Sequence, residues 1–132
     1  MTSAELKTLR ESLGLSQQWL ADRAGVQVRT VKYWESGRNA VPDDVGEIIS
    51  TADGLIARAV RNAVGQAEKM RKEYGKPHEV LLLRYRSEEE LHYSRPDMIG
   101  YPVTYHAALL ARARAALIER GFDLVIDYHE HK

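Results

Sequence analysis

Residues 15–37 constrain the fold more than any other part of the chain, because signals for two short helices lie close together there. Ser16 is a favourable N-cap for a helix from Gln17 to Ala24. Gly25 suits the tight turn that ends this helix, and a third helix is predicted from about Gln27 to Glu35. Two short helices joined by so tight a turn predict a compact helical domain in which they cross at a steep angle.

Further helices are predicted on both sides of this segment. The first helix begins at a capping box, Thr2-x-x-Glu5, and Gly14 follows its end. A fourth helix begins with Pro42 at its first position and extends as far as Lys72, with a break expected near Asp53-Gly54. The apolar residues expected where the first three helices meet are Leu15, Leu20, Ala21, Val26, Val31 and Trp34.

The outward face of the third helix has side chains suited to double-stranded DNA. With Val31 and Trp34 directed inward, helical spacing turns the remaining side chains toward a major groove about 12 Å wide. Arg29 is the best candidate base contact, because its guanidinium matches the O6 and N7 acceptors of guanine. Gln17 lies at a helix N-terminus, where phosphates bind readily. The predicted DNA-contacting residues are Gln17, Gln27, Val28, Arg29, Thr30, Lys32, Tyr33 and Arg38.

This segment resembles the helix-turn-helix of the Cro/lambda-repressor superfamily. The matching residues are Leu15-Ser16-Gln17, Leu20-Ala21, Gly25-Val26 and Trp34-Glu35-x-Gly37. The resemblance implies a buried, structural ion pair between Arg10 of the first helix and Glu35 of the third. Gln27 departs from the pattern, because the superfamily commonly has Ser or Thr as N-cap there.

A narrower resemblance extends beyond the helix-turn-helix. KYWESGRNAVPDDV (residues 32–45) is similar to the anti-CRISPR-associated (Aca) repressors and the related YdiL-type proteins, and two C-terminal stretches are similar more loosely. The resemblance implies an α/β dimerisation domain after the helix-turn-helix. It also implies binding to an inverted repeat in a promoter, repression of an operon that often includes the repressor's own gene, and an essential arginine at Arg29.

The C-terminal half has a mixed pattern that predicts strands as well as helices. We therefore expect an α+β chain, with an all-α helix-turn-helix domain of four or five helices at residues 1–75 and a small α/β dimerisation domain at residues 76–132. The predicted elements of the second domain are strands at 79–85 and 122–128, helices at 87–91 and 104–120, and an irregular segment at 93–102.

Composition narrows the classes of function. The formal net charge is zero, which counts against a non-specific nucleic-acid coat but not against a site-specific binder. The chain has no cysteine, and its five histidines lack the spacing of a metal or catalytic motif. No signal peptide or membrane span is predicted. We therefore expect a cytoplasmic protein of a bacterial or phage-infected cell that is not an enzyme and needs no metal or cofactor.

Recognition of one site in a genome favours a homodimer. One protomer offers one or two bidentate base contacts, each worth about 1–3 kcal/mol, and two half-sites about 34 Å apart would double the discrimination. An antitoxin that neutralises a partner through its C-terminal domain is an alternative, as is a regulator that senses an effector. RNA binding also stays open, as do the operator sequence and the regulated gene.

Overall fold

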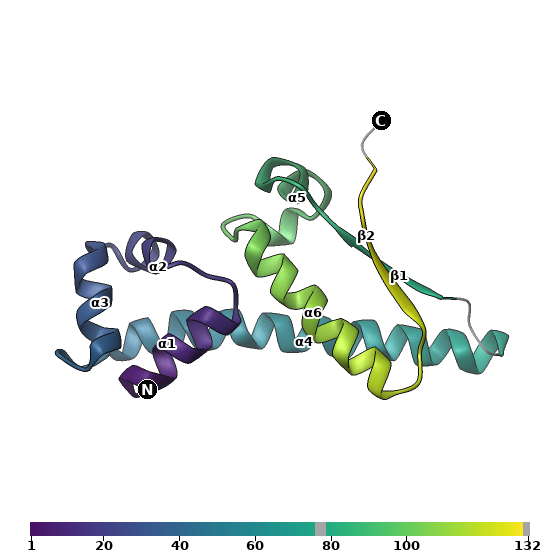
Figure 1. Ribbon diagram of the computed structural model, residues 1–132, viewed down its shortest axis with the longest axis horizontal. Coiled ribbons are helices and arrows are strands. Elements are labelled where there is room, and N and C mark those ends of the chain that lie inside the picture. Colours follow the sequence, from purple (N-terminus) through teal and green to yellow (C-terminus); the bar gives the residue numbers. More distant parts are fainter. Residues whose placement is uncertain (76–78, 131–132) are drawn as a thin grey trace. The chain divides into compact units, whose positions relative to one another are not determined.

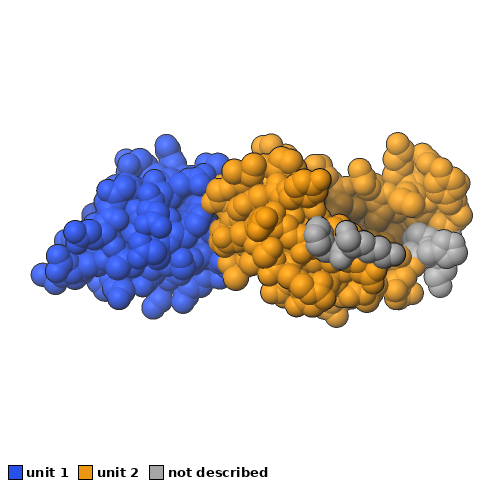
Figure 2. All heavy atoms as spheres, turned by 90° about the horizontal axis from the view of Figure 1, so that it is seen from above, with its two compact units in different colours: residues 1–55 blue, residues 56–132 orange. Residues whose placement is uncertain are grey.

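The computed structural model describes residues 1–75 and 79–130, which form an α+β structure as predicted. Two compact units comprise residues 1–55 and residues 56–132 (Figure 2). None of the described helices has the length and apolar character needed to cross a membrane. In chain order the elements are α1 (Ser3–Ser12), α2 (Gln17–Ala24), α3 (Val28–Ser36), α4 (Asp43–Tyr74), β1 (Val80–Arg84), α5 (Glu88–Ser94), the 3-10 helix η1 (Pro96–Met98), α6 (Val103–Glu119) and β2 (Leu124–Tyr128) (Figure 1).

The first three helices begin and end where local side-chain chemistry places their boundaries. The Thr2 hydroxyl accepts the Glu5 N–H at 3.0 Å, and the Glu5 carboxylate accepts the Thr2 N–H at 2.9 Å, so the predicted capping box is present. The Ser16 hydroxyl accepts the Trp19 N–H at 2.9 Å at the start of α2. Gly25 ends α2 with a φ of 72°, a conformation that side chains with a Cβ rarely adopt.

The core of the first unit confirms most of the predicted contacts between its helices. The buried apolar residues of residues 1–55 are Leu6, Leu13, Leu15, Leu20, Ala21, Val31, Trp34, Val45, Ile49 and Ala52. Val26, which we expected in this core, is half-buried. Because each fully buried aliphatic side chain stabilises a fold by about 1.5–3 kcal/mol, this core holds α1, α2 and α3 in a fixed arrangement.

Helix α4 is continuous from Asp43 to Tyr74, so the expected break near Asp53-Gly54 is wrong. A glycine costs a helix only about 1 kcal/mol, and the buried stripe of α4 passes through this region, with Ala52 and Ile56 fully buried. Pro42 precedes the helix instead of occupying its first position, and its carbonyl accepts the first helical hydrogen bonds.

The domain boundary expected at residues 75 and 76 stays a prediction. Part of the linker expected there, residues 76–78, lies outside the described residues. The two compact units divide within α4, between residues 55 and 56.

A two-stranded parallel sheet organises the second unit. β1 pairs with β2 in the register Val80↔Leu124 to Arg84↔Tyr128, so the predicted strands pair within one chain. The connection between them contains α5, η1 and α6, as parallel strands require a long crossover. The core beneath the sheet consists of Val64, Ala67, Leu117 and Phe122, with Val80, Leu82 and Leu124 packed against it.

The connection between β1 and α6 is more regular than expected. α5 extends to Ser94 instead of ending near residue 91, and η1 occupies part of the segment predicted to be irregular. His106 of α6 is buried beside the ring of Tyr85, with ring centroids 5.3 Å apart. Burial lowers the pKa of His106 to about 4, so its imidazole is neutral at pH 7.

Candidate nucleic-acid interface

The turn between α2 and α3 presents the second helix of the motif to solvent. Gly25 ends α2 in the left-handed conformation, and α3 begins three residues later at Val28. Gln27 has the extended backbone of an N-cap, but its side chain makes no capping hydrogen bond. The departure noted at Gln27 therefore leaves the start of α3 where the motif requires it.

Most of the predicted DNA-contacting residues lie on the surface of α3 and its flanks. Gln27, Arg29, Lys32 and Arg38 are exposed. The other predicted contacts on this helix, Val28, Thr30 and Tyr33, are half-buried. Val31 and Trp34 are buried on the opposite face, which agrees with the predicted orientation of the helix.

Tyr33 and Arg38 lie together at the end of α3. The Arg38 guanidinium carbon is 4.2 Å from the centroid of the Tyr33 ring, within the range of a cation–π interaction. Gly37, with a φ of 84°, ends the helix between them. The sequence predicted two separate DNA contacts here and did not predict this interaction.

A buried ion pair fixes the inner end of α3 to α1. The Arg10 Nε atom donates to Glu35 Oε2 at 2.6 Å, and Arg10 Nη2 donates to Glu35 Oε1 at 2.9 Å. Only 9% of the Arg10 side chain and 3% of the Glu35 side chain are exposed. Arg10 Nη1 also donates to the Leu15 carbonyl at 2.8 Å, so the same guanidinium contacts the segment that leads into α2.

The electrostatics of this pair favour its charged form. Burial opposes ionisation of Glu35, but the hydrogen bonds from Arg10 and Gln17 outweigh it and hold the pKa of the carboxyl below its usual value. The hydrogen bond to Glu35 raises the pKa of Arg10. Because the arginine fork and the carboxylate are matched in a bidentate pair, the arrangement fixes geometry as well as charge.

Gln17 lies closer to this ion pair than we expected. Its side chain is half-buried, and its Nε2 atom donates to Glu35 Oε1 at 3.0 Å. A primary amide has two N–H donors, so this bond occupies one of them. Gln17 therefore connects the N-terminus of α2, where a phosphate contact was predicted, to the pair that positions α3. On the surface of α2, the Arg23 guanidinium lies 5.2 Å from the ring of Trp19, which the sequence did not predict either.

The histidines lie apart from this surface. His92 Nε2 is 2.7 Å from the Tyr101 carbonyl oxygen, and His129 Nδ1 is 3.1 Å from a Glu90 carboxylate oxygen. His78 and His131 fall outside the described residues. Within residues 1–75 and 79–130, no three potential metal-ligating side chains form a cluster.

The N-terminal half of the chain is similar to known DNA-binding repressors. Residues 3–63 match the family model described as a helix-turn-helix domain. The Aca2 repressor of Pectobacterium phage ZF40 is 50% identical over 46 residues, which cover 34% of this chain and 40% of that protein. Repressor protein C of Escherichia phage P2 is 46% identical over 43 residues, which cover 33% of this chain and 43% of that protein. The chain thus spans less than half the length of these curated relatives.

Proposed function

This protein carries a helix-turn-helix domain of the Cro/lambda-repressor superfamily, with similarity to an Aca repressor, and on that basis we propose that it is a sequence-specific transcriptional repressor. It binds an inverted-repeat operator in double-stranded DNA as a homodimer. The operon that it represses includes its own gene and is associated with an anti-CRISPR gene.

The observation that carries this proposal is the exposed outer face of α3 on a rigidly held helix. Arg29 and Lys32 are exposed there, while Val31 and Trp34 anchor the opposite face. The pair between Arg10 and Glu35 limits rotation of α3, so its side chains are presented in a defined direction. Base recognition needs such preorganisation, because a bidentate contact to guanine tolerates little error in position.

Arg29 contacts a guanine in this proposal, and its neighbours hold the DNA backbone. Lys32 and Arg38 are exposed cations that bind phosphates, and Gln17 presents its remaining amide N–H to a phosphate at the start of α2. Gln27, Val28, Thr30 and Tyr33 complete the contact surface. The homodimer doubles these contacts on two half-sites.

The antitoxin alternative lacks a comparable observation. An antitoxin that captures a toxin through a disordered tail would leave its C-terminal segment without a folded partner. Here residues 124–128 pair with β1, and the His129 N–H donates to the Arg84 carbonyl at 2.8 Å. These contacts favour a folded C-terminal domain that serves the repressor itself.

The test is DNA selection followed by substitution of Arg29. Double-stranded DNA enriched from a random pool by the wild-type protein should contain an inverted repeat, and Arg29→Ala should weaken binding to it at least tenfold, since each bidentate contact contributes about 1–3 kcal/mol. Arg114→Ala, which removes an exposed cation from α6, is the matched control and should bind as the wild type does. Both variants should keep the wild-type melting temperature.

Two results would contradict the proposal. One is failure of the wild-type protein to enrich any DNA sequence. The other is an Arg29→Ala variant that binds the enriched sequence with unchanged affinity, which would remove Arg29 from base recognition. A single-stranded RNA of the same sequence, tested in parallel, distinguishes DNA binding from RNA binding.

A further inference from the structure

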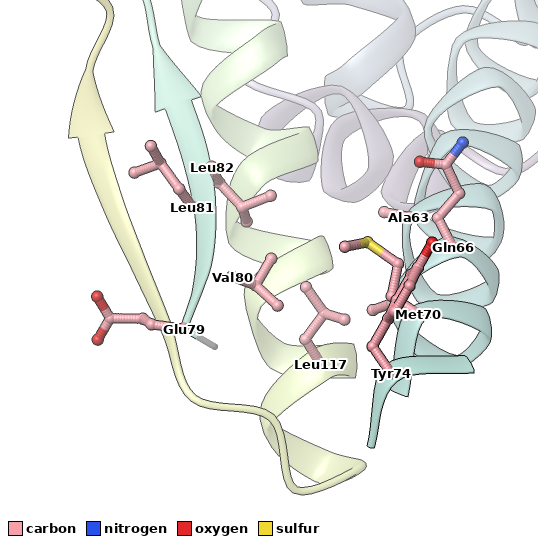
Figure 3. Close-up of a pocket in the computed structure, with 10 residues that line it drawn as sticks. Ala63, Gln66, Met70, Tyr74, Glu79, Val80, Leu81, Leu82 and Leu117 are labelled. Carbon is pink, nitrogen blue, oxygen red and sulfur yellow. The ribbon is translucent and has the colours of Figure 1, made fainter. Parts of the chain in front are cut away.

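The second unit has an apolar groove beside the free edge of its sheet. The groove lies among α4, β1 and α6 and has a volume of about 640 Å³. Figure 3 shows Val80 of β1 and Leu117 of α6 directed into this space, with Met70 and Tyr74 of α4 on its other side. This volume exceeds that of two leucine side chains, so the groove can receive aliphatic side chains from outside.

The rim of this groove is unusually apolar for a surface. Met70 is 55% exposed, Tyr74 is 77% exposed, and Leu81 is 56% exposed. Two-stranded sheets are marginally stable by themselves, and parallel sheets are normally covered on both faces. A contiguous apolar surface of this kind, next to an unpaired strand, indicates a protein interface.

The edge of β1 that faces away from β2 offers backbone groups for pairing. The Val80 N–H donates to the Asp123 carbonyl, and the Arg84 carbonyl accepts the His129 N–H, so even-numbered residues of β1 point their backbone groups toward β2. Because these groups alternate along a strand, the N–H and C=O of Leu81 and Leu83 point to the opposite edge. Within residues 1–75 and 79–130, β1 has β2 as its one strand neighbour.

We propose that this edge and groove receive β1 of a second copy of the chain, in the antiparallel direction. The result is a continuous four-stranded sheet with the order β2–β1–β1–β2, in which the central strands come from the two protomers. The partner's Val80 and the partner's Leu82 would then enter the groove beside Met70 and Tyr74. This inference deepens the proposed function, because it identifies the surface that forms the homodimer.

A second copy suits this surface better than an unrelated strand. A two-fold axis pairs a strand with itself in the antiparallel direction, and the same patch then covers itself on both protomers. β1 has Glu79 before it and Arg84 at its end, both exposed, so antiparallel pairing brings unlike charges together. Between them the run Val80-Leu81-Leu82-Leu83 lacks the charges that usually protect an edge strand from pairing.

Measurement of the mass in solution, for two variants with matched changes, tests the groove. The wild-type chain should have twice the monomer mass of 15.0 kDa at micromolar concentration. Met70→Glu places a charge on the groove and should shift the mass to that of the monomer. Ile118→Glu makes the same change on α6 at a residue that is 45% exposed and does not line the groove, and this variant should stay dimeric.

Two proline variants test which edge of the sheet pairs. Leu81→Pro removes an N–H that points to the free edge of β1 and spares the bonds to β2. Ile126→Pro is the counterpart on β2, where even-numbered residues point away from β1. Leu81→Pro should be monomeric and Ile126→Pro dimeric, with wild-type helical content by circular dichroism in both.

The outcomes separate this interface from the proposed function. A wild-type chain that is monomeric would overturn both the interface and the homodimer, although DNA selection could still succeed. A dimer that survives both Met70→Glu and Leu81→Pro, or that only Ile126→Pro or Ile118→Glu dissociates, would overturn the interface alone. Loss of DNA selection with the predicted masses intact would overturn the repressor and leave the interface standing.

Discussion

The two compact units of this protein owe their structures to interactions of different range along the chain. In residues 1–55, capping bonds three residues apart set the starts of α1 and α2, and one buried ion pair joins α1 to α3. In residues 56–132, the sheet exists only because Val80 meets Leu124 across a long crossover. The comparison teaches that the first unit is specified largely by local chemistry and the second by pairing of distant segments.

The largest expected effect is loss of the ion pair that joins the helices of the first unit. Arg10→Met leaves the Glu35 carboxylate buried without its arginine, and removal of one partner from such a pair costs about 3–5 kcal/mol. Urea denaturation should therefore show a strongly destabilised first unit. The double variant Arg10→Met/Glu35→Leu should recover most of the loss, because it leaves no buried charge, and a double variant as unstable as the single one would contradict this account.

The same pair makes the first unit sensitive to acid. Since the pKa of Glu35 is lower in the folded than in the unfolded state, the pair contributes stability above the unfolded value of about 4.3. This contribution is lost as the pH falls through that value toward the lower folded one.

A smaller effect, in the second unit, comes from the buried imidazole of His106. Its pKa is lowered to about 4 from 6.5 by burial and by Arg95 and Arg84, with Asp97 opposing. The unfolded chain therefore binds the proton first, so the second unit should lose stability as the pH falls from about 6.5 to about 4, by up to about 3 kcal/mol. His106→Gln should show less pH dependence over this range in thermal melts, and an unchanged dependence would assign it to other groups.

The smallest effect tests whether local caps matter equally in both units. Ser16 caps α2 through the Trp19 N–H, and Ser87 caps α5 through the Glu90 N–H at 3.1 Å. Ser16→Ala and Ser87→Ala should each cost about 1 kcal/mol in urea denaturation. Ser50→Ala, at an exposed position within α4, is the control and should change stability by less than about 0.5 kcal/mol. A large difference between the two cap variants would show that the caps depend on their tertiary surroundings.

These differences in range explain what the sequence could predict. The start of α2 at Ser16 and its end at Gly25 depend on residues within one turn, so the pattern was sufficient there. The presence of two strands and a long helix in the C-terminal half was also predictable from alternation and helical spacing. The ion pair between Arg10 and Glu35 followed from the resemblance to a superfamily and not from spacing.

Features that depend on distant residues were not predictable. Continuity of α4 through Gly54 depends on burial of its neighbours, which a helix propensity does not contain. The hydrogen bond from Gln17 to Glu35 joins residues on two helices, and no local pattern signals it. The stacking of Arg38 on Tyr33 likewise required the positions of both side chains.

The division of α3 into a buried face and an exposed face has an evolutionary consequence. Stability depends on Val31, Trp34 and Glu35, whereas Arg29 and Lys32 have no described ion pair in the part of the chain that the structure covers. Substitutions on the exposed face can therefore accumulate with little cost to folding. A lineage of such proteins could exchange one operator for another by changing a few surface side chains, while the scaffold that presents them stays the same.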